Sequence, residues 1–186
     1  MGLLAGETLG LTLPQPHKRL LAILETDGCA ADGVAVATNC WVGRRTMRIE
    51  DYGKVAATFV DTESGQALRI VPRGDIRAKA WRYAPEALNH KWQAQLLGYQ
   101  RMPAAELLAI QPVSLRVPVA QWVGQPGQKV ACDYCGEEIM NGRQVRRAGL
   151  ALCRACAGQS YYSLFLDTQP RPVPMTPASR PAVVER

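Results

Sequence analysis

The first forty residues combine a helical pattern, a short apolar run and a second helical segment. Residues 2–9 carry leucines at helical spacing up to Gly10, and a proline-containing loop follows. The run "RLLAILET" at 19–26 predicts a buried strand because it is short and apolar. "CAADGVAVATNC" at 29–40 predicts a helix of small residues that packs closely on a neighbouring element.

Three later runs have strand character. "TMRIEDYG", "KVAATFVDT" and "QALRIVPR" show alternation or β-branched residues. The turn formers Tyr52-Gly53 and Ser64-Gly65 separate them. We expect these runs to form an antiparallel meander, since short turns join strands that lie side by side.

Beyond residue 84 the apolar positions take up helical spacing. Leu88, Trp92 and Leu96 fall on one side, with Gln95 and Tyr99 beside them, and predict a helix. A shorter helix is expected over residues 104–110. "VSLRVPVAQW" at 113–122 returns to strand character, and its proline favours an edge or a strand end.

These patterns together predict an α+β core in residues 1–122, with helices packed on a mainly antiparallel sheet. Gly and Pro then mark a linker over 123–131, and a small cysteine module follows over 132–166. The last segment, 167–186, has five prolines and few bulky apolar side chains, so we expect it to be disordered.

The cysteine module carries the strongest chemical signal in the chain. Its four cysteines have the spacing C-x2-C-x17-C-x2-C, which is typical of a zinc site. They are Cys132, Cys135, Cys153 and Cys156. A hairpin turning at Asn141-Gly142, and a helix over 154–166, would complete a treble clef. Four thiolates leave no open coordination position, so we expect the zinc to be structural.

Charge and composition narrow the classes of partner. Residues 1–125 hold 14 Lys/Arg against 11 Asp/Glu, and residues 126–166 hold five against three, so the excess charge is spread thinly. Nucleic-acid modules usually concentrate positive charge, so nucleic acid is not the expected partner. No apolar run is long enough to span a bilayer, and the N-terminus lacks a signal-peptide pattern. We therefore expect a cytoplasmic protein without a membrane partner.

A nucleic-acid-binding or protein-interaction zinc finger is the alternative function. Arg143, Arg146, Arg147 and Arg154 could contact phosphates, although such a cluster is more often a solvated face. Tyrosines of the module could stack on bases, although packing is the commoner role.

Two further cysteines lie near the ends of the helix predicted over 29–40. Cys29 and Cys40 would be roughly 16 Å apart on a continuous helix, too far for a disulfide. Packing of small residues of the helix on a sheet is one explanation for each cysteine, and it is weaker for Cys40 beside the bulky Trp41. The wider segment, from "LETDGCAADGVAVATNC" through "EDYGK" to "ALRI", resembles the FmdE family of formylmethanofuran dehydrogenase. The matching positions are Glu25, Cys29, Asp32, Cys40, Gly43, Asp51, Tyr52, Gly53, Lys54 and Arg69.

The resemblance implies a role connected with molybdenum- or tungsten-dependent formylmethanofuran dehydrogenase and one-carbon metabolism. It also implies a homodimer and an enzyme partner. The residue types of Cys29, Asp32, Cys40, Tyr52 and Lys54 would suit a core pocket for a second metal or a pterin-type ligand. No Gly-rich nucleotide loop or iron–sulfur spacing accompanies them, so we expect an accessory or ligand-binding protein without independent catalysis.

Two departures from the family pattern concern this core pocket. The chain has Asn39-Cys40-Trp41 where the family has Gly-Cys-Thr, which alters the turn around the cysteine. Family members begin with a His-Gly-His-x-Cys-Pro-Gly segment, whereas this chain begins inside the helix that follows it. Either the start lies too far downstream or this member has lost that chemistry. His17 and His90 are expected to be ordinary surface residues.

Overall fold

A computed structural model describes residues 1–123 and 127–164, which belong to two compact units, Met1–Val123 and Gly124–Arg186. The expected disordered tail lies outside the described residues, as does part of the expected linker. The proposed boundaries of core, linker and module stay a prediction. Among the helices of the described ranges, none combines the length and apolarity that crossing a bilayer requires.

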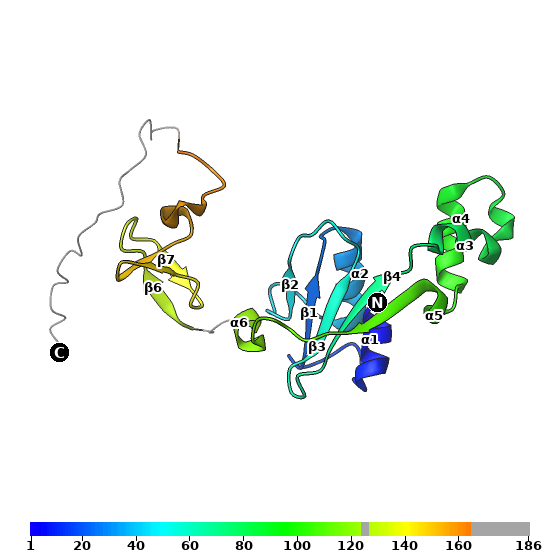
Figure 1. The fold of residues 1–186 in the computed structure, drawn as a ribbon, viewed down its shortest axis with the longest axis horizontal. Helices are drawn as coiled ribbons and strands as arrows, with labels where there is room; N and C mark the ends of the chain where they lie inside the picture. Colours follow the sequence, from blue (N-terminus) through cyan, green and yellow to red (C-terminus); the bar gives the residue numbers. More distant parts are fainter. Residues whose placement is uncertain (124–126, 165–186) are drawn as a thin grey trace. The chain divides into compact units, whose positions relative to one another are not determined.

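Unit 1 contains a five-stranded sheet in the order β2-β1-β3-β4-β5 (Figure 1). Its strands are β1 (Leu20–Leu24), β2 (Met47–Ile49), β3 (Ala57–Asp61), β4 (Ala67–Pro72) and β5 (Leu108–Pro112). Its α-helices are α1 (Gly2–Leu9), α2 (Cys29–Thr38), α3 (Ile76–Tyr83), α4 (Lys91–Arg101), α5 (Ala104–Leu107) and α6 (Val119–Val123). Three of the four strand pairs are antiparallel, which confirms the α+β class and the mainly antiparallel sheet.

The central strand β1 is buried on both faces, which explains its unbroken apolar run. Leu20, Ala22 and Leu24 belong to a core cluster that includes residues of α1 and α2. Leu21 and Ile23 belong to a second cluster, against which Val113, Leu115, Val119 and Trp122 pack. The chain after β5 therefore covers the sheet face opposite the two helices.

The expected antiparallel meander is wrong for its first strand. β2 pairs with β1, not β3, and the pairing is parallel, with Ala22 opposite Met47. The connection through α2 brings the chain back to the same end of the sheet, so β2 runs in the direction of β1. β3 then pairs antiparallel on the other side of β1. The turn residues alone could not distinguish this crossover from a hairpin.

Two expectations for the second half of unit 1 are also wrong. No strand forms over 113–122, because β5 ends at Pro112 and α6 occupies the end of that segment. Leu88 lies in a turn before α4, while Trp92 and Leu96 lie on its exposed side. The buried side of α4 carries Ala94 and Gly98 instead.

Close contact between α3 and α4 requires this arrangement. A Cβ on Gly98 would lie 2.5 Å from the carbonyl oxygen of Ala80 in α3, a distance at which atoms overlap. Ala84, Ala87 and Ala94 form the small core of this hairpin, with Trp81 and Leu97 packed against it. Small side chains therefore make the closest contact, and Trp92 and Leu96 of α4 are left outside.

We predict that Gly98→Ala destabilises the protein by about 1–3 kcal/mol, because the added methyl group would push α4 away from α3. Gly33→Ala in α2 is the matched control, since no atom lies within 4 Å of a Cβ at that position. It should be neutral or stabilising, because alanine favours a helix over glycine. Urea unfolding followed by circular dichroism measures both; a Gly98→Ala protein as stable as the parent would contradict the close contact.

Candidate metal centre

The second unit contains two short hairpins. The first pairs β6 (Lys129–Ala131) with β7 (Glu138–Met140), and the second pairs β8 (Val145–Arg147) with β9 (Leu150–Leu152). The expected hairpin at Asn141-Gly142 is wrong, because that turn joins the two hairpins. The second hairpin turns at Ala148-Gly149, where both residues have positive φ, as two-residue hairpin turns favour.

The first cysteine pair occupies the turn between β6 and β7. The Cys132 amide donates to the Glu137 carbonyl oxygen, and the Gly136 amide donates to the Cys132 carbonyl oxygen. Gly136 has a φ of 77°, a conformation that glycine adopts without strain. This tight turn holds Cys132 and Cys135 on one side of the hairpin end.

The second pair follows β9 directly. Cys153 comes after the strand, and Cys156 lies in a single helical turn, Ala155–Gln159. The helix expected over 154–166 is thus limited to this turn within the part of the chain that the structure describes. The amide of Cys153 donates to the Cys132 sulfur at 3.2 Å, which ties the second pair to the first.

Asp133 fixes the two hairpins against each other, a role that sequence reasoning missed. Its amide donates to the Ala151 carbonyl oxygen at 2.8 Å, and its carboxylate accepts from the Ala151 amide at 2.7 Å. Asp133 therefore links the first cysteine turn to β9. The only signal in the sequence is an acidic residue between the first two cysteines, which is weak without the fold.

The four sulfur atoms meet at one point. All lie within 4.8 Å of one another, and those of Cys135 and Cys153 are 4.0 Å apart. A disulfide would need about 2.05 Å. Tetrahedral bonds of about 2.3 Å to a common zinc ion place sulfurs about 3.8 Å apart, close to the spacing seen. The arrangement therefore matches a single four-coordinate metal ion better than disulfide pairs.

The surroundings of the cysteine cluster shift the pKa values of its thiols in different directions. Burial acts to raise the pKa of Cys132, but backbone N–H groups, including those of Cys135 and Cys153, lower it to about 6. Burial and the neighbouring thiols raise the pKa of Cys156 and that of Cys135. One thiolate thus forms readily and opposes ionisation of the others, so a cation is needed to hold four thiolates together.

The five residues expected to form a core pocket lie in different environments. Cys40 is 1% exposed, and its thiol donates to the Leu20 carbonyl oxygen at 3.4 Å. Burial raises the pKa of this thiol, which disfavours the reactive thiolate. Cys29, Asp32, Tyr52 and Lys54 are on the surface. The structure separates the buried Cys40 from these four, and a ligand site made by all five stays a prediction.

Glu25 holds the loop that carries Tyr52 and Lys54 through its backbone, and its side chain forms an ion pair. The Glu25 carbonyl oxygen, just after β1, accepts from the amides of Tyr52 at 2.9 Å and Lys54 at 3.1 Å. The Glu25 carboxylate receives two hydrogen bonds from Arg69 of β4, which also donates to Gln111. Glu25 is 7% exposed. In the sequence, Glu25 and Arg69 were only family-matching positions, and their pairing could not be read from spacing.

Three comparisons with known proteins bear on both units. A family model described as "FmdE, Molybdenum formylmethanofuran dehydrogenase operon" matches residues 1–109. An Archaeoglobus fulgidus protein, described as a "Probable S-adenosyl-L-methionine-binding protein", is 25% identical. That match covers 88% of this chain and 48% of the relative, so the chain spans about half the relative's length.

The third comparison concerns the fold. The crystal structure of a tungsten formylmethanofuran dehydrogenase FmdE-like protein from Syntrophus aciditrophicus superposes with a TM-score of 0.51. It is 24% identical, and the match covers 77% of this chain and 74% of that one. At this level of identity the likeness establishes a common fold.

We predict that Glu25→Gln destabilises the protein by about 1–3 kcal/mol at pH 7, since a charged hydrogen-bonded pair is lost. The hydrogen bonds from Arg69 lower the pKa of Glu25. Its contribution to the free energy of unfolding is therefore present above the ordinary glutamate pKa of about 4.3 and lost as the pH falls through the lower folded value.

Urea unfolding at pH 7, 5 and 3 measures this dependence, with Glu50→Gln at an exposed position as the control. The difference between parent and Glu25→Gln should shrink toward pH 3. A difference that stays the same across this range would show that the ion pair does not supply it.

Proposed function

The chain belongs to the FmdE family, and we propose that it is a zinc-binding accessory protein of molybdenum- or tungsten-dependent formylmethanofuran dehydrogenase, without catalysis of its own. The match of residues 1–109 to the family model carries this proposal, because the family's description refers to that enzyme's operon. The four-cysteine cluster in the second unit supplies its metal-binding part.

The proposed metal is zinc in a structural role. Four cysteines close the coordination shell, so no position is left for a substrate. Within residues 127–164, the apolar cluster of this unit has four buried members, Cys132, Ile139, Leu152 and Ala157, two of them small. A unit with so small a core needs a metal to fold, and zinc bound by four thiolates supplies that free energy. The cysteine turn, the hairpins and the last helical turn together support a treble clef.

The first unit would supply the accessory contacts. We extend the proposal to a homodimer, which the resemblance implies; its support is that β2 is an edge strand with exposed apolar residues Trp41, Val42 and Ile49 nearby in the chain. Binding of S-adenosylmethionine is not proposed. The relative with that description is about twice as long, and this chain has no Gly-rich nucleotide loop.

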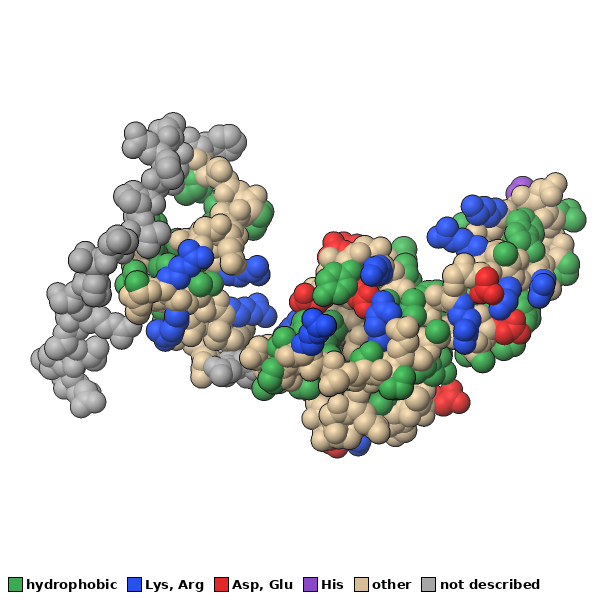
Figure 2. Space-filling view, in the orientation of Figure 1, with side chains coloured by type: hydrophobic (Ala, Val, Ile, Leu, Met, Phe, Trp, Pro, Cys, Tyr) green, Lys and Arg blue, Asp and Glu red, His purple; other side chains and the backbone are tan. Residues whose placement is uncertain are grey.

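Nucleic-acid binding by the second unit is the rival function. Arg143, Arg146 and Arg147 are exposed in or beside β8, and Figure 2 shows basic side chains on this unit. Tyr161 and Tyr162 are also exposed, with ring centroids 5.1 Å apart. Four thiolates and Zn²⁺ add a net charge of −2 to the unit, which leaves little excess positive charge to attract phosphates.

We predict that the purified protein contains about one zinc per chain and that Cys132→Ser removes most of it, because three thiolates bind the ion far more weakly than four. Elemental analysis by mass spectrometry measures the content. Met140→Ser is the control, since that side chain is exposed in the same unit and lies outside the cluster, and should retain the full content. Equal zinc in both variants would rule out the four-cysteine site.

We predict that the protein co-elutes with formylmethanofuran dehydrogenase from a methanogen in size-exclusion chromatography and that the isolated chain has no dehydrogenase activity.

Binding to labelled single- and double-stranded DNA and RNA should be undetectable at physiological salt. Nucleic-acid affinity that falls steeply with salt and disappears in an Arg143→Ala, Arg146→Ala, Arg147→Ala variant would favour the rival function instead.

A further inference from the structure

The α3–α4 hairpin exposes apolar side chains that its own packing does not use. Trp92 is 75% exposed and Leu96 is 43% exposed, at positions i and i+4 of α4. Leu88, in the turn before the helix, is 75% exposed and has a φ of 47°, a conformation that leucine rarely adopts. The hairpin thus holds large apolar groups in water while alanines and a glycine fill its interior.

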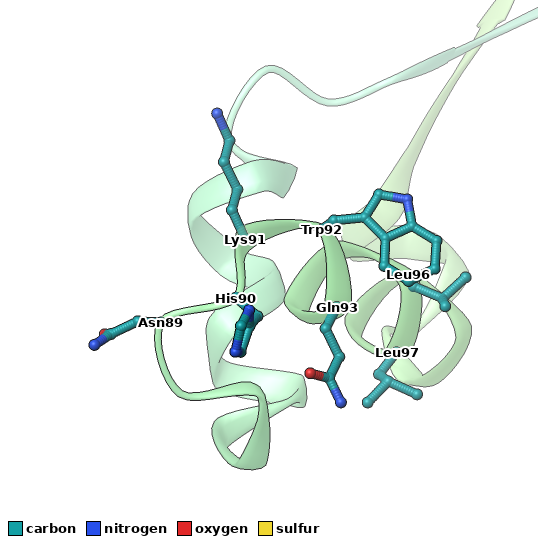
Figure 3. A pocket seen from close by; sticks show the side chains of 7 residues that line it. All are labelled: Asn89, His90, Lys91, Trp92, Gln93, Leu96 and Leu97. Carbon is teal, nitrogen blue, oxygen red and sulfur yellow. The ribbon is translucent and has the colours of Figure 1, made fainter.

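Trp92 and Leu96 border a pocket of about 440 Å³. Figure 3 shows the Trp92 indole beside Leu96, with Gln93 and Leu97 next to them along α4. His90 and Lys91 supply polar groups to the lining. We call Trp92, Leu96 and the pocket beside them the Trp92 face. The concave shape suits an inserted side chain.

The charge of the hairpin indicates which partner would fit. Residues 75–106, the hairpin with its flanking acidic residues, hold five Lys/Arg against three Asp/Glu, a net charge of +2. The three acids already pair with Lys79 and Arg101. Within the described residues, Arg77, Arg82 and Lys91 take part in no ion pair, and all three are exposed. Figure 2 shows Lys and Arg side chains around the hydrophobic ones of the hairpin.

We propose that the Trp92 face binds an acidic amphipathic helix of a partner protein. An apolar side chain of that helix would enter the pocket beside Trp92 and Leu96, the mode in which helices bind grooves. Its carboxylates would meet Lys91, which lines the pocket. Tryptophan and arginine are the residues on which binding energy most often concentrates at such surfaces.

Two other occupants fit the observations less well. A second copy using the same face would bring two positively charged hairpins together, which is unfavourable. A flat anionic membrane would leave the pocket unfilled, and the exposed apolar side of α4 is short. The acidic helix satisfies both the apolar pocket and the unpaired positive charge.

The test uses the full chain and a fluorescent synthetic peptide of about 18 residues, long enough to form an amphipathic helix, with leucines on one side and glutamates on the other. A peptide with lysines in place of the glutamates and a scrambled acidic peptide are the controls. Fluorescence anisotropy should show binding to the acidic helix only, weakened by salt. Binding no tighter than that of either control would overturn the proposal.

Variants of the protein locate the surface. Trp92→Asp should weaken binding about tenfold or more, as removal of a central aromatic contact does. Val36→Asp is the matched control, because Val36 on α2 is 70% exposed, and should bind as the parent does. Lys91→Glu keeps the apolar contacts. It should weaken binding of the acidic peptide and strengthen binding of the lysine peptide. Unchanged binding in Trp92→Asp would overturn the assignment.

Two further measurements decide between occupants. Self-association that Trp92→Asp abolishes, seen by light scattering, would assign the face to a second copy. Trp92-dependent sedimentation with phosphatidylserine vesicles, without peptide binding, would assign it to a membrane. This proposal depends on the proposed accessory function in one respect, because it takes the partner to be a protein. If the acidic peptide binds but formylmethanofuran dehydrogenase does not co-elute, the surface stands and the proposed function fails.

Discussion

Five consecutive buried residues, Leu20–Leu24, are the constraint around which unit 1 is built. Their backbone groups pair with β2 on one side and β3 on the other, and their side chains meet a separate apolar cluster on each sheet face. A polar side chain at these positions would lose its hydration without gaining a partner. The run must therefore be apolar throughout, and other elements of the chain must cover both faces of the sheet at this strand.

The sequence could predict features that are encoded within one segment, but not features that depend on how distant segments come together. The positions of β1 and α2 were predicted because burial and small-residue packing leave a pattern within the segment itself. The partner of β2 was not, since hydrogen bonding across a sheet depends on which way the chain returns after α2. The exposed side of α4 was also misjudged: helical spacing shows that Trp92 and Leu96 share a side but not whether that side is buried.

The same difference between local and non-local signals separates the cysteine cluster, which the sequence could predict, from the expected core pocket. Two C-x2-C pairs specify a site almost by themselves, because each turn is short and the metal requires all four sulfurs at one point. Cys29, Asp32, Cys40, Tyr52 and Lys54 come from α2 and from two loops after it, so their spacing carries no such requirement. The structure instead shows Cys40 bonded inside the core and Glu25, paired with Arg69, holding the loop of Tyr52 and Lys54.

The hairpin of α3 and α4 differs from the rest of unit 1 in how its large apolar residues are used. In the sheet, bulky residues such as Phe59 and Ile70 fill the interior. In the hairpin, Gly98 against Ala80 sets a helix contact too close for bulky residues. Trp92 is therefore not required by the packing of the hairpin, and its exposure carries no benefit for folding in water. A selective reason for tryptophan at this position must lie outside the hairpin, in whatever its exposed face contacts.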